Sequence, residues 1–138
     1  MNQRTTIDVL NGETPPEGSV IVGYHITALM PGAKDREERY LDIEELGPDE
    51  DLAVRKATAG AVADASELIS IEGRLGILGI WWLAGMQDGK RDTYKSLVPM
   101  FTNKAMERID PYIKVEVELD ADIDEDIDPE DPTSGAST

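Results

Sequence analysis

The acidic stretch DADIDEDIDPED, residues 120–131, has the residue types and spacing that come closest to a chemical site. Aspartate occupies every second position from Asp120 to Asp128, and an EF-hand loop of twelve residues also takes its calcium ligands from alternating positions. Glu125 stands where that loop needs glycine for its sharp turn, and Asp131 is shorter than the glutamate that closes the site. The sequence therefore predicts no specific metal site and no cofactor. Weak, unspecific binding of divalent cations is kept as the third functional interpretation.

The charge of the whole chain favours a different role for these acids. The 138 residues include 29 acids and 13 bases, which gives a formal net charge of −16. A field of this sign repels nucleic acids and anionic membranes and attracts basic protein surfaces. We therefore expect no direct binding to nucleic acid or membrane. The expected partner is a protein with a basic surface, including a nucleic-acid-binding protein that the acids would inhibit by mimicking DNA.

Acids near the C-terminus and two adjacent tryptophans are the predicted partner-binding residues. Neighbouring residues on a helix point about 100° apart, so we expect one of the two indoles to reach the surface. Tryptophan is also enriched at binding hot spots. The predicted set is Glu116, Glu118, Asp120, Asp122, Asp124, Glu125, Asp126, Asp128, Trp81 and Trp82.

Four other uses of these segments stay open. Residues 120–138 could be only a solvated tail, and the alternating run IKVEVELDADID could add a strand to the sheet of a partner. The segment around Trp81 and Trp82 could instead drive self-association, as expected of a structural or assembly factor such as a small acidic viral protein. Residues 90–108 hold five bases and two acids, a local charge of +3 on which the acidic tail could fold back.

No catalytic residue is predicted, and we expect that the protein is not an enzyme. The run GYHITAL, which contains His25 and Thr27, resembles the hydrophobic-His-x-Thr-hydrophobic strand of the two-histidine phosphoesterases. In that family two such motifs face each other, and their histidines act as base and acid. This chain has a single His, so the pair cannot form within one chain, and His25 is expected to be an ordinary half-buried residue. The absence of Cys excludes thiolate nucleophiles and Cys-based metal sites.

Hydrophobic patterning predicts the elements that position these residues. Alternation predicts strands over residues 5–10, 19–30, 39–46 and 113–119. Helices are expected over 47–72, 74–88 and 92–109, with Pro99 breaking or kinking the last one. The first helix would carry an apolar stripe, and glycines at 73, 76 and 79 would give the second helix a close-packed face. The residues of the stripe are Val54, Ala57, Ala61, Ala65 and Leu68.

Together these elements predict an α+β fold, in which a small antiparallel sheet packs on about three helices and an acidic, flexible C-terminal tail follows. The expected boundaries are an N-terminal segment and linker at 1–18, a single domain at 19–119 and a disordered tail at 120–138. The longest apolar run, residues 75–86, is too short to span a bilayer, and residues 1–13 lack the apolar core of a signal peptide. We therefore expect a cytoplasmic protein.

Overall fold

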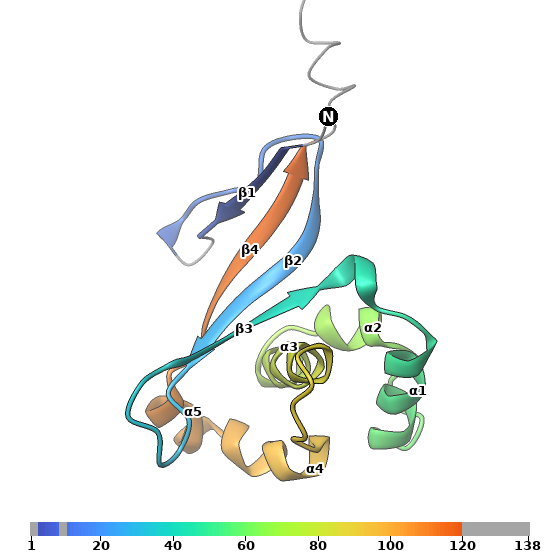
Figure 1. Ribbon diagram of the computed structural model, residues 1–138, viewed down its shortest axis with the longest axis vertical. Coiled ribbons are helices and arrows are strands. Elements are labelled where there is room, and N and C mark those ends of the chain that lie inside the picture. The colour runs from blue at the N-terminus through green and yellow to red at the C-terminus, as the bar shows by residue number, and fades with distance from the viewer. Residues whose placement is uncertain (1–2, 9–10, 120–138) are drawn as a thin grey trace, which may run out of the picture. The chain divides into compact units, whose positions relative to one another are not determined.

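In a computed structural model of the chain, the described residues, 3–8 and 11–119, form an α+β fold (Figure 1). A four-stranded antiparallel sheet has the order β1-β4-β2-β3 and accompanies several helices, so the predicted fold class is confirmed. The strands are β1 (Gln3–Ile7), β2 (Ser19–Ala28), β3 (Glu37–Asp42) and β4 (Tyr112–Leu119). The four strands correspond to the four segments expected from the sequence, and the first of them begins at Gln3 instead of residue 5.

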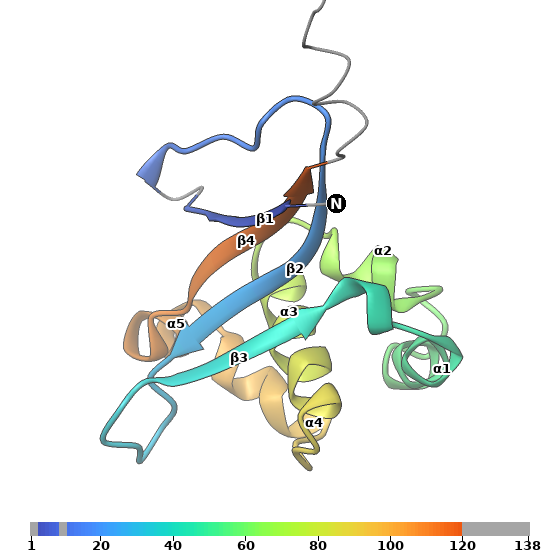
Figure 2. The same ribbon diagram turned by 45° about the horizontal axis from the view of Figure 1, so that its top comes forward.

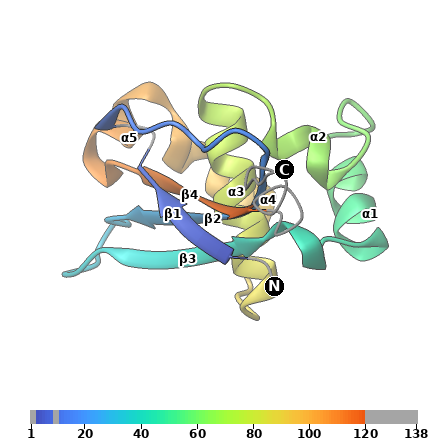
Figure 3. The ribbon, with the colours of Figure 1, turned by 90° about the horizontal axis from the view of Figure 1, so that it is seen from above.

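The chain divides into two compact units, and β2 contributes residues to both. The smaller unit comprises Met1–Val22 and Lys114–Thr138, and the larger one is Gly23–Ile113. Within the smaller unit β1 pairs with β4 in antiparallel register, with Arg4 opposite Glu118 (Figure 3). Val115 and Val117 are buried while the residues between them are more exposed, which confirms the half-buried strand expected from the alternating sequence.

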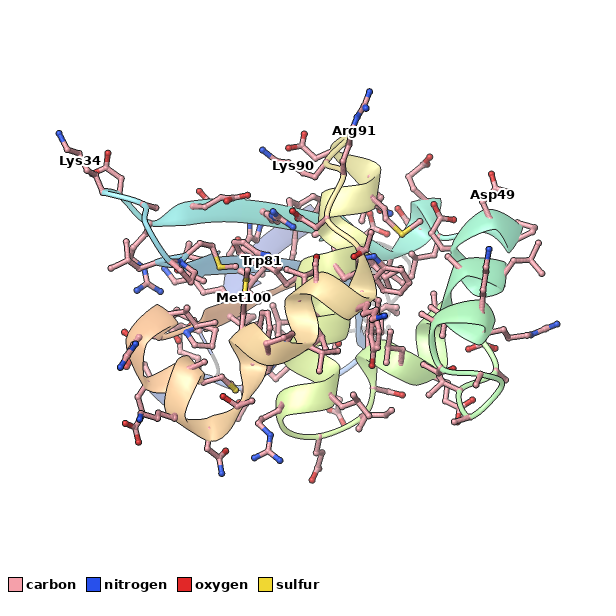
Figure 4. All side chains as sticks on the ribbon, turned by 90° about the horizontal axis from the view of Figure 1, so that it is seen from below. Lys34, Asp49, Trp81, Lys90, Arg91 and Met100 are labelled. Carbon is pink, nitrogen blue, oxygen red and sulfur yellow. The ribbon has the colours of Figure 1, made fainter. Side chains whose placement is uncertain are left out.

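The larger unit is built on the hairpin of β2 and β3, and the helices of this unit lie on one face of the hairpin (Figures 2 and 4). Alternate residues of the two strands pair across this face, namely Tyr24 with Leu41, Ile26 with Arg39 and Ala28 with Glu37. Ile26, Ala28 and Leu41 are fully buried and belong to the hydrophobic core of the unit. The alternation of residues that predicted β2 therefore also identifies the face of the strand that the helices cover.

The helical elements all belong to the larger unit. They are the 3₁₀-helix η2 (Ile43–Glu45), α1 (Pro48–Ala57), α2 (Ala65–Ile69), α3 (Arg74–Gln87), α4 (Tyr94–Leu97), the 3₁₀-helix η3 (Val98–Phe101) and α5 (Asn103–Ile109). Helix α3 confirms the helix expected over 74–88. It is the central helix of the core, because it packs against β3 and α2 and nearly all its residues from Gly76 to Gly85 are buried.

Two of the three glycines expected on the close-packed face of α3 have that role. A Cβ atom at Gly79 would lie 2.6 Å from Cγ of Leu68 on α2, and one at Gly76 would collide with the carbonyl oxygen of Ile71. The absence of a side chain at Gly79 lets α2 approach α3 closely, and the absence of one at Gly76 leaves room for the backbone that connects the two helices. Gly73 differs, because it precedes the helix and adopts a φ of 89°, in the region that favours glycine.

The single helix expected over 47–72 is wrong, because the chain leaves the helix after Ala57. Ala59 and Gly60 both have positive φ, and Gly60 N–H bonds to the carbonyl oxygen of Arg55, which closes the end of α1. Asp64 then caps α2 by accepting a hydrogen bond from Glu67 N–H. The predicted alanine stripe is wrong for the same reason, since Ala57 and Ala61 are exposed at the break while Val54, Ala65 and Leu68 are buried.

The segment 92–109 is divided into α4, η3 and α5, which confirms the expected break at Pro99. Pro99 lies in the first turn of η3, and Thr102 then caps α5 by accepting a hydrogen bond from Ala105 N–H. The apolar side chains of this segment are only partly buried. Leu97, Phe101 and Ile109 belong to the core, whereas the side chain of Val98 is 45% exposed.

Candidate functional site

The predicted acids divide between β4 and the part of the chain outside the described residues. Glu116 and Glu118 lie on one face of β4, and Arg4 of β1 forms ion pairs with both, at 3.4 and 3.2 Å. Their side chains are only 17% and 22% exposed, so one cation and partial burial reduce the negative field that they present. The other predicted acids, Asp120, Asp122, Asp124, Glu125, Asp126 and Asp128, lie outside the described residues.

The expectation that one of the two tryptophans reaches the surface is wrong. Trp81 is 0% and Trp82 6% exposed, and Figure 4 shows Trp81 between the hairpin and the helices. The ring of Trp82 packs edge-on against Tyr94 of α4, with centroids 5.1 Å apart. Helix α3 is covered on several sides by β3, α2 and α4, so two directions about 100° apart both point into the protein. Neither indole presents an apolar patch to a partner.

A buried arginine, which the sequence patterning did not identify, lies next to Trp81. Arg39 is on the covered face of β3, and its guanidinium carbon lies 4.0 Å from the centroid of the Trp81 ring. Its nitrogens contact carboxylate oxygens of Glu37 and Asp92, each at 2.6 Å, and Nη1 donates to the carbonyl oxygen of Trp81 at 3.1 Å. Arg39 and Leu41 are two positions apart on the strand and therefore share a face. This spacing was the signal in the sequence that could have identified Arg39 as buried. Because its charge is enclosed and paired, we regard this cluster as structural.

The densest group of acids in the described residues lies between the end of β3 and the first turn of α1. This 42–51 acidic segment, residues 42–51, contains six acids and no base. Three of the acids serve the backbone, because Asp42, Glu50 and Asp51 accept hydrogen bonds from the N–H groups of Glu44, Gly47 and Ala65, respectively. The other three, Glu44, Glu45 and Asp49, are exposed, and Asp49 points away from α1 in Figure 4.

A groove of about 780 Å³ lies beside the first turns of α3, and we call it the α3–η3 groove. Its apolar lining comes mainly from Leu75 and Leu78 of α3 and from Val98 and Phe101 of η3. Polar groups lie at the same place, because the guanidinium of Arg74 donates a hydrogen bond to the side-chain oxygen of Asn103. Tyr94 also lines the groove, and burial raises the pKa of its phenol above the ordinary value of 10.0.

His25 has the surroundings expected of a half-buried strand residue. Its side chain is 29% exposed, its ring centroid lies 4.6 Å from that of Tyr40, and Nδ1 is 3.7 Å from a carboxylate oxygen of Glu38. Within residues 3–8 and 11–119, no three His, Asp or Glu side chains are placed to hold a metal ion. No helix in this part of the chain has the length and apolar character needed to cross a bilayer.

Comparisons with family models, with curated proteins and with solved structures gave no match for this chain. Its function is therefore argued from its own residues, among which the exposed acids of the 42–51 acidic segment and the α3–η3 groove are the two candidate binding surfaces.

Proposed function

We propose that the protein is a non-catalytic binding or regulatory protein that engages a basic surface on another protein. Two separate groups of acids would each attract such a partner, namely the exposed acids of the 42–51 acidic segment and the acids from residue 116 onward. The proposal is supported mainly by the distribution of carboxylates in the 42–51 acidic segment. Three are occupied by backbone N–H groups, and three others have exposed side chains with no base among these ten residues.

The position of these acids on α1 keeps their charge local. Asp49 lies in the first turn of the helix, whereas the bases Arg55 and Lys56 lie in its last turn. A helix rises about 1.5 Å per residue, so most of the length of α1 separates the two groups. At physiological ionic strength charges farther apart than about 8 Å are largely screened. A basic partner that approaches the N-terminal end of α1 would therefore encounter mainly negative charge.

The sharper form of the proposal is that the partner is a nucleic-acid-binding protein and that the acids act as a DNA mimic. Its support is the density of acids in two blocks, nine among residues 35–51 and eight, without a base, among residues 120–138. A protein whose basic groove binds phosphates would be attracted to either block. Duplex DNA should then compete with this chain for the same partner.

The test compares two doubly substituted full-length chains that have the same net charge. Glu45→Gln with Asp49→Asn neutralises two acids of the 42–51 acidic segment, and Glu17→Gln with Glu107→Gln neutralises two exposed acids elsewhere. Each chain is immobilised, incubated with cell lysate and washed with rising salt, and the retained proteins are identified by mass spectrometry. We expect the first variant to release its partner at lower salt than the control variant, because local charge pairs lose strength as salt screens them.

Thermal unfolding of both variants establishes that a loss of binding is not a loss of folding. Asp49→Asn removes a favourable charge from a helix N-terminus and should cost less than about 1 kcal/mol of stability. Equal release of the partner by both variants, or release that does not depend on salt, would contradict the proposed surface. Failure of duplex DNA to displace the partner would contradict the DNA-mimic form alone.

A further inference from the structure

The α3–η3 groove combines a buried apolar floor with an exposed apolar rim. Leu78 and Phe101 at its floor are each 3% exposed, whereas Leu75 and Val98 are 41% and 45% exposed. Only five large hydrophobic residues within 3–8 and 11–119 are exposed to this degree, and two of them line this one groove. The two come from different elements, α3 and η3, so a segment lying between them would cover both.

The charge around the groove is opposite to that of the chain as a whole. Arg74 lines the groove, and its guanidinium is held by the Asn103 side chain. Two exposed lysines, Lys95 and Lys104, directly follow lining residues in the sequence, and Glu72 is the only acid in the lining. A segment that fits the groove should therefore be both apolar and acidic.

We propose that the α3–η3 groove receives residues 120–131 of a second copy of this chain. This stretch places Ile123 and Ile127 among eight acids and contains no base, so it matches both the apolar rim and the basic surroundings. The isoleucines would cover Leu75 and Val98, and the carboxylates would lie near Arg74 and the two lysines. Nineteen residues follow Leu119, and an extended chain spans about 3.3 Å per residue, which is ample reach for a neighbouring molecule.

Such a contact joins two different surfaces and is therefore heterologous, so it can build rings or open chains of copies. The long-range repulsion between two copies with a net charge of −16 opposes it, but this repulsion is screened beyond about 8 Å at physiological salt. The inference goes beyond the proposed function, because it concerns an interaction between two copies of the protein. It also implies competition, since a basic partner that binds residues 120–131 would withdraw them from the groove.

The test measures self-association of the full chain by sedimentation equilibrium at physiological salt. We expect the apparent mass to rise with concentration, and Leu75→Glu to weaken the association by about tenfold or more, because it removes a leucine contact and adds a repelling charge. Leu75 is the second residue of α3, where an acid favours the helix dipole, so this variant should still fold. Leu52→Glu makes the same change at a leucine on α1 that is 60% exposed, and it should associate like the parent chain.

A second arm changes the other side of the contact. Ile123→Ser with Ile127→Ser should weaken self-association as much as Leu75→Glu, and a peptide of residues 120–131 should inhibit the association of the parent chain. A chain that is monomeric at all concentrations would overturn the proposal, as would equal weakening by Leu52→Glu. Hydrogen exchange at the Leu75 amide can be compared between the parent chain and the double Ile→Ser variant. If exchange is slower in the parent chain by the same factor at every protein concentration, the segment docks within one chain, and this result would also overturn the proposal.

The proposed function and the proposed self-association can each be contradicted without affecting the other. Self-association is measured with this protein alone, and the Glu45→Gln with Asp49→Asn variant should retain it. The Leu75→Glu variant should in turn retain the basic partner up to at least the same salt concentration as the parent chain, because it leaves the 42–51 acidic segment unchanged and releases residues 120–131 from the groove.

Discussion

At the scale of single residues, Arg39 shows how the core of the larger unit accommodates a full charge. Its side chain is 4% exposed and lies between the Trp81 ring and the carboxylates of Glu37 and Asp92. Such pairs stabilise little in themselves, but removing one partner leaves the others without their charge complement. Gly85 on α3 completes the arrangement, because a Cβ atom there would meet Nη1 and lie 3.2 Å from the guanidinium carbon of Arg39.

We predict that Gly85→Ala destabilises the protein by about 1–3 kcal/mol, although alanine favours helix more than glycine by about 1 kcal/mol. The added methyl group must displace a guanidinium whose position is fixed by Glu37, Asp92 and the Trp81 carbonyl. Urea unfolding of the single variants and of Gly85→Ala with Arg39→Met forms a double-mutant cycle. The cost of Gly85→Ala should nearly vanish in the Arg39→Met background, and an unchanged cost there would show that Arg39 is not the cause.

At the scale of elements, one side chain attaches the end of α3 to the strand β3. The amide of Gln87 donates to the carbonyl oxygen of Asp42 and accepts from its N–H, both at 2.8 Å. Both polar groups of one backbone residue are therefore satisfied by a side chain, as they would be by another strand. Because β3 is a terminal strand of the sheet, this contact also blocks part of an edge at which another chain could pair.

We predict that Gln87→Ala destabilises the protein by about 1–2 kcal/mol, since two hydrogen bonds are lost at a half-buried position. The amide hydrogen of Asp42 should exchange with solvent faster in this variant, measured by NMR. The amide of Leu29, which donates to the carbonyl oxygen of Ile109, should be protected as before and serves as the internal control. Exchange at Asp42 that matches the parent chain would show that the Gln87 contact does not protect this edge.

At the scale of the whole molecule, the net charge of −16 is unevenly placed along the chain. Residues 120–138 contain eight acids and no base, so they contribute half of it. The remaining residues contribute the other half, and some of their acids form ion pairs with bases such as Arg4 and Arg39. Repulsion among like charges destabilises a compact state, and salt reduces it by screening.

We predict that the thermal midpoint of the full chain rises between about 10 mM and about 150 mM sodium chloride, a range in which the Debye length falls from about 30 to about 8 Å. Choline chloride should raise it equally, because screening depends on ionic strength and not on the identity of the cation. Scanning calorimetry measures both series. A midpoint that falls with salt would show that the attractive ion pairs outweigh the self-repulsion.

The sequence by itself determined the features that depend on local patterning. Strict alternation in IKVEVEL identified β4, the apolar run after Gly73 identified α3, and Pro99 marked the division of the last helical segment. Each of these signals is a periodicity or a backbone restriction carried by neighbouring residues. The fold class followed from their order. The acidic segments were also visible, because charge density needs no fold to be counted.

Only the tertiary structure decided which of these residues meet. The pairing of β1 with β4 joins positions more than a hundred residues apart, and no local pattern specifies it. The break at Ala59 and Gly60 occurs where alanine periodicity alone predicts a continuous helix, because positive φ and the cap at Asp64 end it. Trp81 and Trp82 are buried because β3, α2, η3 and α4 surround α3. The α3–η3 groove exists because segments separated by about twenty residues pack side by side, and such proximity is a property of packing and not of sequence spacing.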